Sequence, residues 1–216
     1  HTLGLMLALA RHIPQAHASM QDKKWDRKSY MGVELRGKTL GVVGFGRIGR
    51  AVAKRAQAFE MNVIAHDPYI PLDIAQDFGA ELVSLDELFA RADFITLHSV
   101  ITDQTRHMIN RDTLAHMKPG VRIVNAARGA LINEADLAEA IRSGQVAGAA
   151  LDVYAAEPPP PDHPLVGLPN VIDTPHLAAS TEEAQVAVAV EAAQLVAAAL
   201  LRGEYQNVVN PEALQR

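Results

Sequence analysis

The chain has 216 residues, of which 49% are hydrophobic and 21% charged, with a formal net charge of -5 and no cysteine. This length supports one sizeable core or two small domains, and the composition is ordinary for a soluble globular protein. The lack of long basic runs argues against a nucleic-acid surface. The lack of cysteine excludes disulfides and thiolate chemistry and is consistent with a reducing cytoplasm.

The first 37 residues are predicted to form a helix followed by an irregular arm. Residues 3–10 are apolar on nearly every side of a helix, so we expect another domain or subunit to cover them. Because neither a positively charged segment nor an initiator methionine precedes them, we expect a helix of a truncated chain rather than a signal peptide. Residues 20–37 are polar, and Trp25 and Tyr30 suggest that this arm packs on another surface.

The next segment has the pattern of a dinucleotide-binding unit. Residues 39–43 form an apolar run that predicts a buried parallel strand, and a helical pattern begins at Ala51. The turn between them has the spacing G-x-G-x-x-G over residues 44–49. Strand, turn and helix occur in the order that binding of a dinucleotide requires.

Each part of this turn has a physical role in binding a pyrophosphate. Gly44 permits the tight turn, Gly46 lets the backbone approach the ligand, and Gly49 lets the helix pack closely on its strand. The amides that open the helix, near Arg47 and Ile48, point at the ligand, and the helix dipole favours its negative charge.

An acidic residue follows the second strand of this unit. Residues 62–66 predict a strand, and Asp67 stands directly after it, eighteen residues past Gly49. A carboxylate at this place accepts hydrogen bonds from the adenosine ribose and repels the 2′-phosphate of NADP. The sequence therefore predicts NAD as the cofactor.

The alternation of strands and helices continues along the rest of the chain. Further strands are predicted at residues 81–83, 93–97, 121–125, 147–151 and 170–173, and helices at 84–91, 110–117, 133–143 and 180–203. This order predicts an α/β fold with a doubly wound parallel sheet. Ligands bind beyond the carboxyl ends of such strands, which is where Asp67, His98, Arg128, Asp152 and His176 stand.

Two other kinds of site are not expected. Gln185, Glu191 and Gln194 interrupt the Ala/Val-rich last helix, which argues against a membrane span. The nine histidines have no spacing typical of metal ligands, so no metal is predicted.

Three residues on loops after the later strands predict catalysis. Arg128 can hold a carboxylate with two parallel hydrogen bonds. His176, which follows Pro175, can take a proton from a hydroxyl near neutral pH, and Glu157 can orient its ring. Each residue taken singly could be an ordinary surface group, but together on ligand-end loops they predict an active site.

These motifs resemble those of the D-2-hydroxyacid dehydrogenase family. The resemblance covers nearly the whole chain and is carried by residues 9–14, 24–28, 37–41, 44–50, 125–129, 149–153, 157–158 and 175–177. It implies a single NAD-binding domain of the Rossmann type without the smaller substrate domain of the family. Residues 1–37 would be the dimerisation helix and arm, 38–203 the Rossmann core, and 204–216 the start of a crossing toward that substrate domain.

The resemblance also implies site residues. The catalytic Arg, Glu and His of the family fall on Arg128, Glu157 and His176. Its cofactor contacts fall on Gly44, Gly46, Arg47, Ile48, Gly49, Asp67, Ser99, Ala126, Ala127, Arg128, Asp152 and His176. After His98 the family usually has Thr-Pro, whereas Ser99-Val100 stand here.

The implied activity is NAD-dependent oxidation of a 2-hydroxy acid by a cytoplasmic homodimer. The match is strongest to the branch that oxidises D-3-phosphoglycerate in serine biosynthesis. A glyoxylate or hydroxypyruvate reductase would share the same residues, and the family also includes corepressors that sense NAD(H) and act through partner binding. Neither a nucleic acid nor a membrane is expected as a partner, and the isolated chain is expected to be poorly active.

Overall fold

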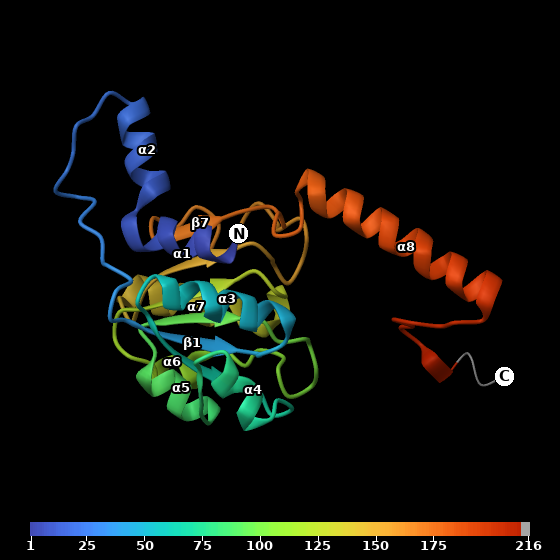
Figure 1. The fold of residues 1–216 in the computed structure, drawn as a ribbon. Helices are drawn as coiled ribbons and strands as arrows, with labels where there is room; N and C mark the ends of the chain where they lie inside the picture. The colour runs from blue at the N-terminus through green and yellow to red at the C-terminus, as the bar shows by residue number, and fades with distance from the viewer. Residues whose placement is uncertain (213–216) are drawn as a thin grey trace. The chain divides into compact units, whose positions relative to one another are not determined.

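The computed structural model describes residues 1–212, in two compact units, one of residues 1–178 and one that begins at Ala179. The first unit contains a seven-stranded parallel sheet in the order β3-β2-β1-β4-β5-β6-β7. Its strands are β1 (Thr39–Val43), β2 (Asn62–His66), β3 (Glu81–Leu82), β4 (Phe94–Leu97), β5 (Val121–Asn125), β6 (Val146–Leu151) and β7 (Val171–Asp173). The predicted doubly wound parallel sheet is confirmed (Figure 1).

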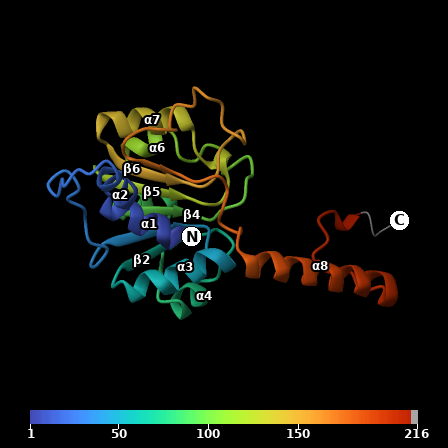
Figure 2. The same ribbon diagram turned by 90° about the horizontal axis from the view of Figure 1, so that it is seen from above.

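Helices flank this sheet. The helices of the first unit are α1 (Thr2–Arg11), α2 (Ile13–Gln21), α3 (Arg47–Ala58), α4 (Leu72–Asp77), α5 (Leu85–Arg91), α6 (Arg111–Ala115), the 3₁₀ turn η1 (Gly129–Leu131) and α7 (Glu134–Ser143), of which α2 packs on α1 rather than on the sheet. Figure 2 shows α1 and α3 on one side of the sheet and α6 and α7 on the other. The strand order reverses between β1 and β4, so a crevice for a ligand is expected beyond these strands.

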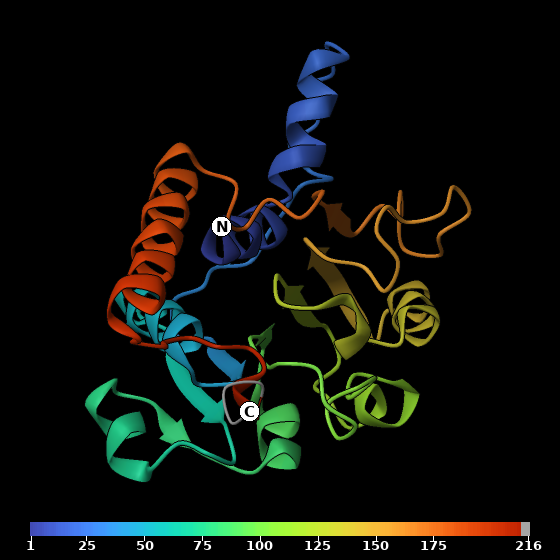
Figure 3. The same ribbon diagram turned by 90° about the vertical axis from the view of Figure 1, so that its right-hand side faces the viewer.

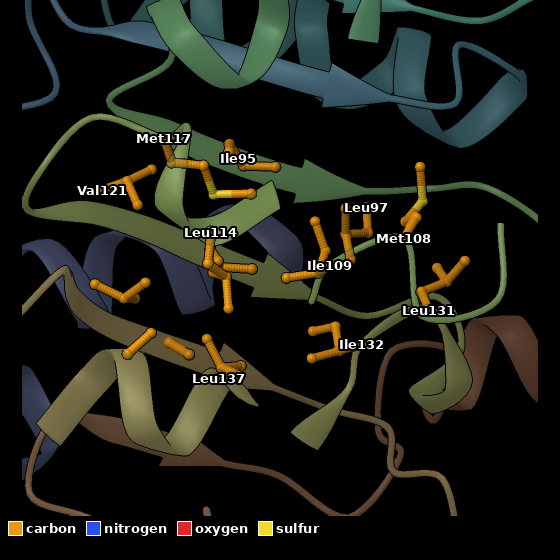
Figure 4. Packing of buried hydrophobic residues seen from close by; sticks show 14 of the residues in the cluster. Ile95, Leu97, Met108, Ile109, Leu114, Met117, Val121, Leu131, Ile132 and Leu137 are labelled. Carbon is orange, nitrogen blue, oxygen red and sulfur yellow. The ribbon is translucent and has the colours of Figure 1, made fainter. Parts of the chain in front are cut away.

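Alternate residues of each strand supply the two cores. In β1, Leu40 and Val42 pack with buried residues of α1 and α3, whereas Val43 packs on the opposite side with α5. Figure 4 shows the second core, where Ile95 of β4, Leu114 of α6 and Leu137 of α7 point toward one another. Both faces of the sheet are covered, which explains why its strands are continuous apolar runs in the sequence.

The first helix differs from the prediction. One face of α1, with Leu5, Met6, Leu9 and Ala10, is buried on β5, β6 and β7 of the same chain. The expectation that another domain or subunit covers this helix is therefore wrong for that face. A second helix, α2, follows after His12, whose left-handed φ of 53° turns the chain between the two helices.

The second unit contains α8 (Glu182–Arg202), which ends at Gly203 as predicted. By length and composition alone α8 could cross a membrane, a weak signal that core helices of soluble proteins also give. The predicted crossing segment, residues 204–216, falls partly in this unit, and residues 213–216 lie outside the described part of the chain.

Candidate active site

The glycine turn between β1 and α3 is shaped by close approaches at two of its three glycines. Gly44 has a φ of +91°, and a Cβ there would lie 2.6 Å from the His98 carbonyl carbon. A Cβ at Gly49 would lie 2.1 Å from the Gly44 oxygen, so α3 could not pack on the turn. These two glycines are thus required by the fold itself, whereas a Cβ at Gly46 would meet open space.

The open side of this turn fits a pyrophosphate. No side chain caps the first turn of α3, where Arg47 and Ile48 are exposed, so the amides there are available to an anion. Gly46 begins the helix and leaves the approach to these amides clear. The residues present therefore fit the phosphates of a dinucleotide.

Asp67 lies at the rim of the same turn. Its Oδ2 accepts a hydrogen bond from the Phe45 amide at 2.8 Å, and its Oδ1 accepts one from the Tyr69 amide at 2.9 Å. Each carboxylate oxygen keeps a further lone pair for a ribose hydroxyl. The two amides hold the Asp67 carboxylate at a place where its charge would repel the 2′-phosphate of NADP.

The loop after β4 lies against the glycine turn, because Gly44 contacts the backbone of His98 and Ser99. His98 bonds to the Thr96 hydroxyl through its Nε2 at 2.9 Å, and burial lowers the pKa of His98 to about 4. A neutral histidine here adds no positive charge. Ala126 and Ala127, after β5, are half-buried on the neighbouring loop.

Glu157 and His176 meet, although nineteen residues separate them. The Nδ1 of His176 lies 2.8 Å from Oε2 of Glu157, and Oε1 of Glu157 accepts a hydrogen bond from the Tyr154 amide at 3.1 Å. These two bonds hold the pKa of the Glu157 carboxyl below its ordinary value, with the His176 contact as the larger cause. An ionised Glu157 is the partner that a protonated Nδ1 requires. A cavity of about 390 Å³, lined mostly by apolar groups, lies beside the pair.

Asp152 holds the segment that carries His176. Its carboxylate is buried and accepts hydrogen bonds from the amides of Leu177 at 2.8 Å and Ala178 at 2.9 Å, and from the Thr174 hydroxyl at 2.5 Å. The Nε2 of His1 lies 3.1 Å from Oδ1 of Asp152, the oxygen that also accepts the Leu177 amide. In this arrangement Asp152 anchors the chain on both sides of His176, and its predicted contact with the cofactor stays a prediction.

Arg128 is exposed on the loop between β5 and η1. Its Nη1 donates to its neighbour Ala127 at 2.6 Å, and the Asn125 side chain donates to the Arg128 carbonyl at 2.9 Å. Asn125 is fully buried, so it fixes the loop backbone while the guanidinium remains in solvent. Figure 3 shows the sheet nearly along its strands, with the connecting loops at the ends of the strands.

Sequence reasoning did not identify the residues that support this site. The Tyr154 amide donates a hydrogen bond to Glu157. The Thr174 hydroxyl donates one to Asp152. Because Thr174 stands directly after β7, its position in the sequence could have indicated the contact with Asp152. Among residues 1–212, no group of three or more His, Cys, Asp or Glu side chains could hold a metal ion.

Comparison with known proteins identifies the family to which the chain is similar. Residues 3–178 match the model of the family described as D-isomer specific 2-hydroxyacid dehydrogenase, NAD binding domain. The chain is similar to the D-3-phosphoglycerate dehydrogenase of Methanocaldococcus jannaschii, at 56% identity over 97% of the chain and 40% of the relative. It is also 49% identical to the enzyme of that name from Rattus norvegicus, over 99% of the chain and 40% of the relative. The chain thus spans about 40% of the length of these curated relatives.

Two solved structures with the same fold are a reductase and a dehydrogenase. A glyoxylate reductase from Paecilomyes thermophila has a TM-score of 0.90 and 38% identity, covering 98% of this chain and 64% of that one. A D-lactate dehydrogenase from Aquifex aeolicus, complexed with NAD and lactic acid, has a TM-score of 0.85 and 32% identity, covering 94% and 65%.

Proposed function

Because the chain belongs to the family of D-isomer specific 2-hydroxyacid dehydrogenases, as an NAD-binding domain, we propose that it serves the oxidation of D-3-phosphoglycerate to 3-phosphohydroxypyruvate. The names of the relatives that match nearly the whole chain support this substrate. Because the chain spans about 40% of their length, it would supply the cofactor site and catalytic residues of a larger enzyme.

The observation that carries the proposal is the contact between His176 and Glu157. With Nδ1 of His176 donating to the ionised Glu157 carboxylate at 2.8 Å, the neutral ring keeps its lone pair on Nε2. This nitrogen can then take the proton of the substrate hydroxyl. As the proton arrives, the negative charge of Glu157 stabilises the imidazolium that forms.

Arg128 would hold the substrate. Its exposed guanidinium offers two parallel N–H donors to the carboxylate next to C2, which fixes the hydroxyl in reach of His176. Arg128 and His176 follow β5 and β7, which β6 separates, at the same carboxyl end of the sheet. When bound, NAD supplies the acceptor for the hydride that leaves C2.

The cofactor would lie along the turn already described. The amides of α3 bind its pyrophosphate, and Asp67 binds the adenosine ribose. Ser99, Ala126 and Ala127 would line the path from there to His176. In the reverse reaction, protonated His176 returns its proton to the oxygen of a 2-keto acid as the carbonyl is reduced.

A second candidate is reduction of glyoxylate or hydroxypyruvate. The glyoxylate reductase structure matches 98% of the chain at a TM-score of 0.90, and the residues proposed for catalysis would serve either substrate. A corepressor that senses NAD(H) is a candidate of another class. It would bind the cofactor without turnover.

We further propose a homodimer in the cytoplasm. Trp25 is 78% exposed and Met31 83% exposed on the arm of a single chain, and a second copy would cover them. Arg27 of that copy would then reach toward the substrate phosphate. The sequence offers no basic surface for nucleic acid.

A substrate panel on the full-length protein tests the proposal. NADH formation from D-3-phosphoglycerate, and NADH consumption with 3-phosphohydroxypyruvate, hydroxypyruvate and glyoxylate, are measured under the same conditions. The proposal expects the highest kcat/KM for the phosphorylated substrate pair. A preference for glyoxylate would favour the second candidate, and binding of NAD without turnover of any substrate would favour the corepressor.

A further inference from the structure

A cluster of enclosed polar side chains behind Glu157 has no part in the proposed mechanism. Tyr154 is buried, the His163 side chain is 4% exposed, and the Glu134 side chain is 18% exposed. Polar groups in such a place destabilise the fold unless they are paired. Their partners include the Ala155 amide, two residues before Glu157, and Asp173, three residues before His176.

Two consecutive amides join Glu134 to Glu157. The Tyr154 amide donates to Oε1 of Glu157 at 3.1 Å, and the Ala155 amide donates to Oε1 of Glu134 at 2.8 Å. Glu134 is the first residue of α7, so its backbone is fixed by a helix whose side chains enter the core. The peptide between Tyr154 and Ala155 is thereby held from α7, and it in turn holds the carboxylate that contacts His176.

The loop of Arg128 packs on the same peptide. A Cβ at Gly129 would lie 1.9 Å from the carbonyl carbon of Tyr154 and 2.4 Å from the Ala155 nitrogen. Only glycine allows this approach, so a shift of the peptide would be transmitted to the residue after Arg128.

Tyr154 also connects to the loop of His176. Its hydroxyl donates to Oδ1 of Asp173 at 2.8 Å, and Asp173 ends β7 three residues before His176. Burial, together with the bond to Asp173, raises the pKa of the Tyr154 hydroxyl, which therefore stays a donor at neutral pH.

His163 closes the cluster. Its Nε2 lies 3.1 Å from Oε2 of Glu134, without the geometry of a hydrogen bond, and its ring stands edge-on to Tyr154 with 5.3 Å between centroids. The Leu165 amide donates to its Nδ1 at 3.3 Å. The imidazole thus limits the movement of both Glu134 and the Tyr154 ring.

We infer that Glu134 is a positioning residue for the proposed reaction, which holds the Tyr154–Ala155 peptide and through it sets Glu157 against His176. The inference rests on the proposed function for the roles of Glu157 and His176. Glu134 touches neither substrate nor cofactor in this account. Its effect is on the orientation of the His176 ring.

The tautomer of His176 is the readout, because it does not depend on turnover. Long-range ¹H–¹⁵N spectra of the 216-residue chain at neutral pH report which ring nitrogen carries the proton, with His176→Ala used to assign the signal. In the wild-type chain we expect the proton on Nδ1. In Glu134→Ala we expect the spectrum to shift toward that of Glu157→Ala, which has no acceptor for the Nδ1 proton, whereas Glu134→Gln, which still accepts the Ala155 bond, restores the wild-type tautomer.

Glu139→Ala is the matched control, since Glu139 is an exposed acid on α7 that pairs with Arg111 on the surface. It should keep the wild-type spectrum. If Glu134→Ala does not fold, Glu134→Asp carries the same expectation, because it keeps the charge but withdraws the carboxylate by one methylene.

Two results would overturn the inference. If Glu157→Ala changes the tautomer and the Glu134 variants do not, Glu134 has no positioning role and the proposed catalytic pair stands. If Glu157→Ala also leaves the tautomer unchanged, both the inference and the pairing fail. In the full-length protein, Glu134→Ala should lower kcat by up to about 10²-fold, the effect of a misplacement of about 1 Å, with the KM for NAD unchanged.

Discussion

His176 has the backbone conformation that best shows how single residues build this site. Its φ of 56° is in the left-handed region, which costs a non-glycine residue on the order of 1–3 kcal/mol. The carboxylate of Asp152 binds the next two amides, and the Asp152 carbonyl accepts the amide of His176 itself at 2.8 Å. The strained backbone therefore persists because a buried acid holds both sides of it.

Asp67 should decide between the two dinucleotides. Asp67→Asn keeps an acceptor for one ribose hydroxyl but removes the charge that repels a 2′-phosphate. We expect NAD affinity to fall by about tenfold, since hydrogen bonds to charged groups contribute about 1.5–3 kcal/mol, and the gap between NAD and NADP to narrow. Calorimetry measures both affinities. Equal affinity of the unaltered chain for NAD and NADP would refute this role.

His98 should make stability depend on pH. Its pKa is about 4 in the folded chain and about 6.5 in the unfolded one, so the unfolded state binds the proton more readily between these values. Stability is therefore full above pH 6.5 and falls as the pH drops toward 4, by about 3 kcal/mol. Denaturant unfolding across this range should show a shallower loss for His98→Gln. Parallel curves for the two proteins would contradict the assignment.

Among the secondary-structure elements, the turn between β1 and α3 contains one glycine that folding requires, Gly49, and one that we expect only NAD binding to require, Gly46. Gly46→Ala places its Cβ in open space with an ordinary φ of -70°, so we expect unchanged stability but lost NAD affinity, because the methyl occupies the pyrophosphate approach. Gly49→Ala, with its Cβ 2.1 Å from the Gly44 oxygen, should cost about 1–3 kcal/mol of stability. Thermal unfolding and calorimetry on both variants test this. If Gly46→Ala binds NAD normally, the pyrophosphate does not lie on this turn.

The elements that were predicted well are those with a strong local signal. The strands at 39–43, 62–66 and 121–125 agree residue for residue, because buried parallel strands are continuous apolar runs. The short helix α4, of six residues and mostly exposed, has too little apolar pattern to be recognised. The predicted helix at 110–117 is shorter, at Arg111–Ala115.

The same reasoning explains which parts of the site were missed. Glu157 and His176 could be proposed because carboxylate and imidazole on ligand-end loops suit one another. The bonds from backbone amides to Glu134 and Asp152 leave no side-chain pattern in the sequence, and their partners are 21 or more residues away. Such support becomes visible only once the loops are placed in space.

At the scale of the molecule, the chain alone should bind NAD but turn over D-3-phosphoglycerate very poorly. The cofactor turn lies within residues 1–178, whereas exclusion of water and placement of the far end of a substrate normally need a second domain that closes. Parallel calorimetry and NADH assays on the 216-residue chain and the full-length protein measure this. Full activity of the shorter chain would contradict the division of roles.

The exposed arm should place two copies together. Light scattering at micromolar concentration is expected to give the mass of a dimer, and Trp25→Ala together with Met31→Ala should shift it toward the monomer while NAD binding persists. Tyr69→Ala is a suitable control, since Tyr69 is 84% exposed outside the arm. A monomer in the unaltered protein would show that the arm is not an interface.

In the proposed dehydrogenase reaction, His176 of this NAD-binding domain transfers the proton. The most direct measurement compares kcat for D-3-phosphoglycerate in the full-length protein and its His176→Ala variant, with NAD affinity measured on both. The account predicts a loss of about 10²–10⁴-fold in kcat, typical of a missing general base, at nearly unchanged NAD affinity. A variant that keeps the rate of the unaltered enzyme would contradict it.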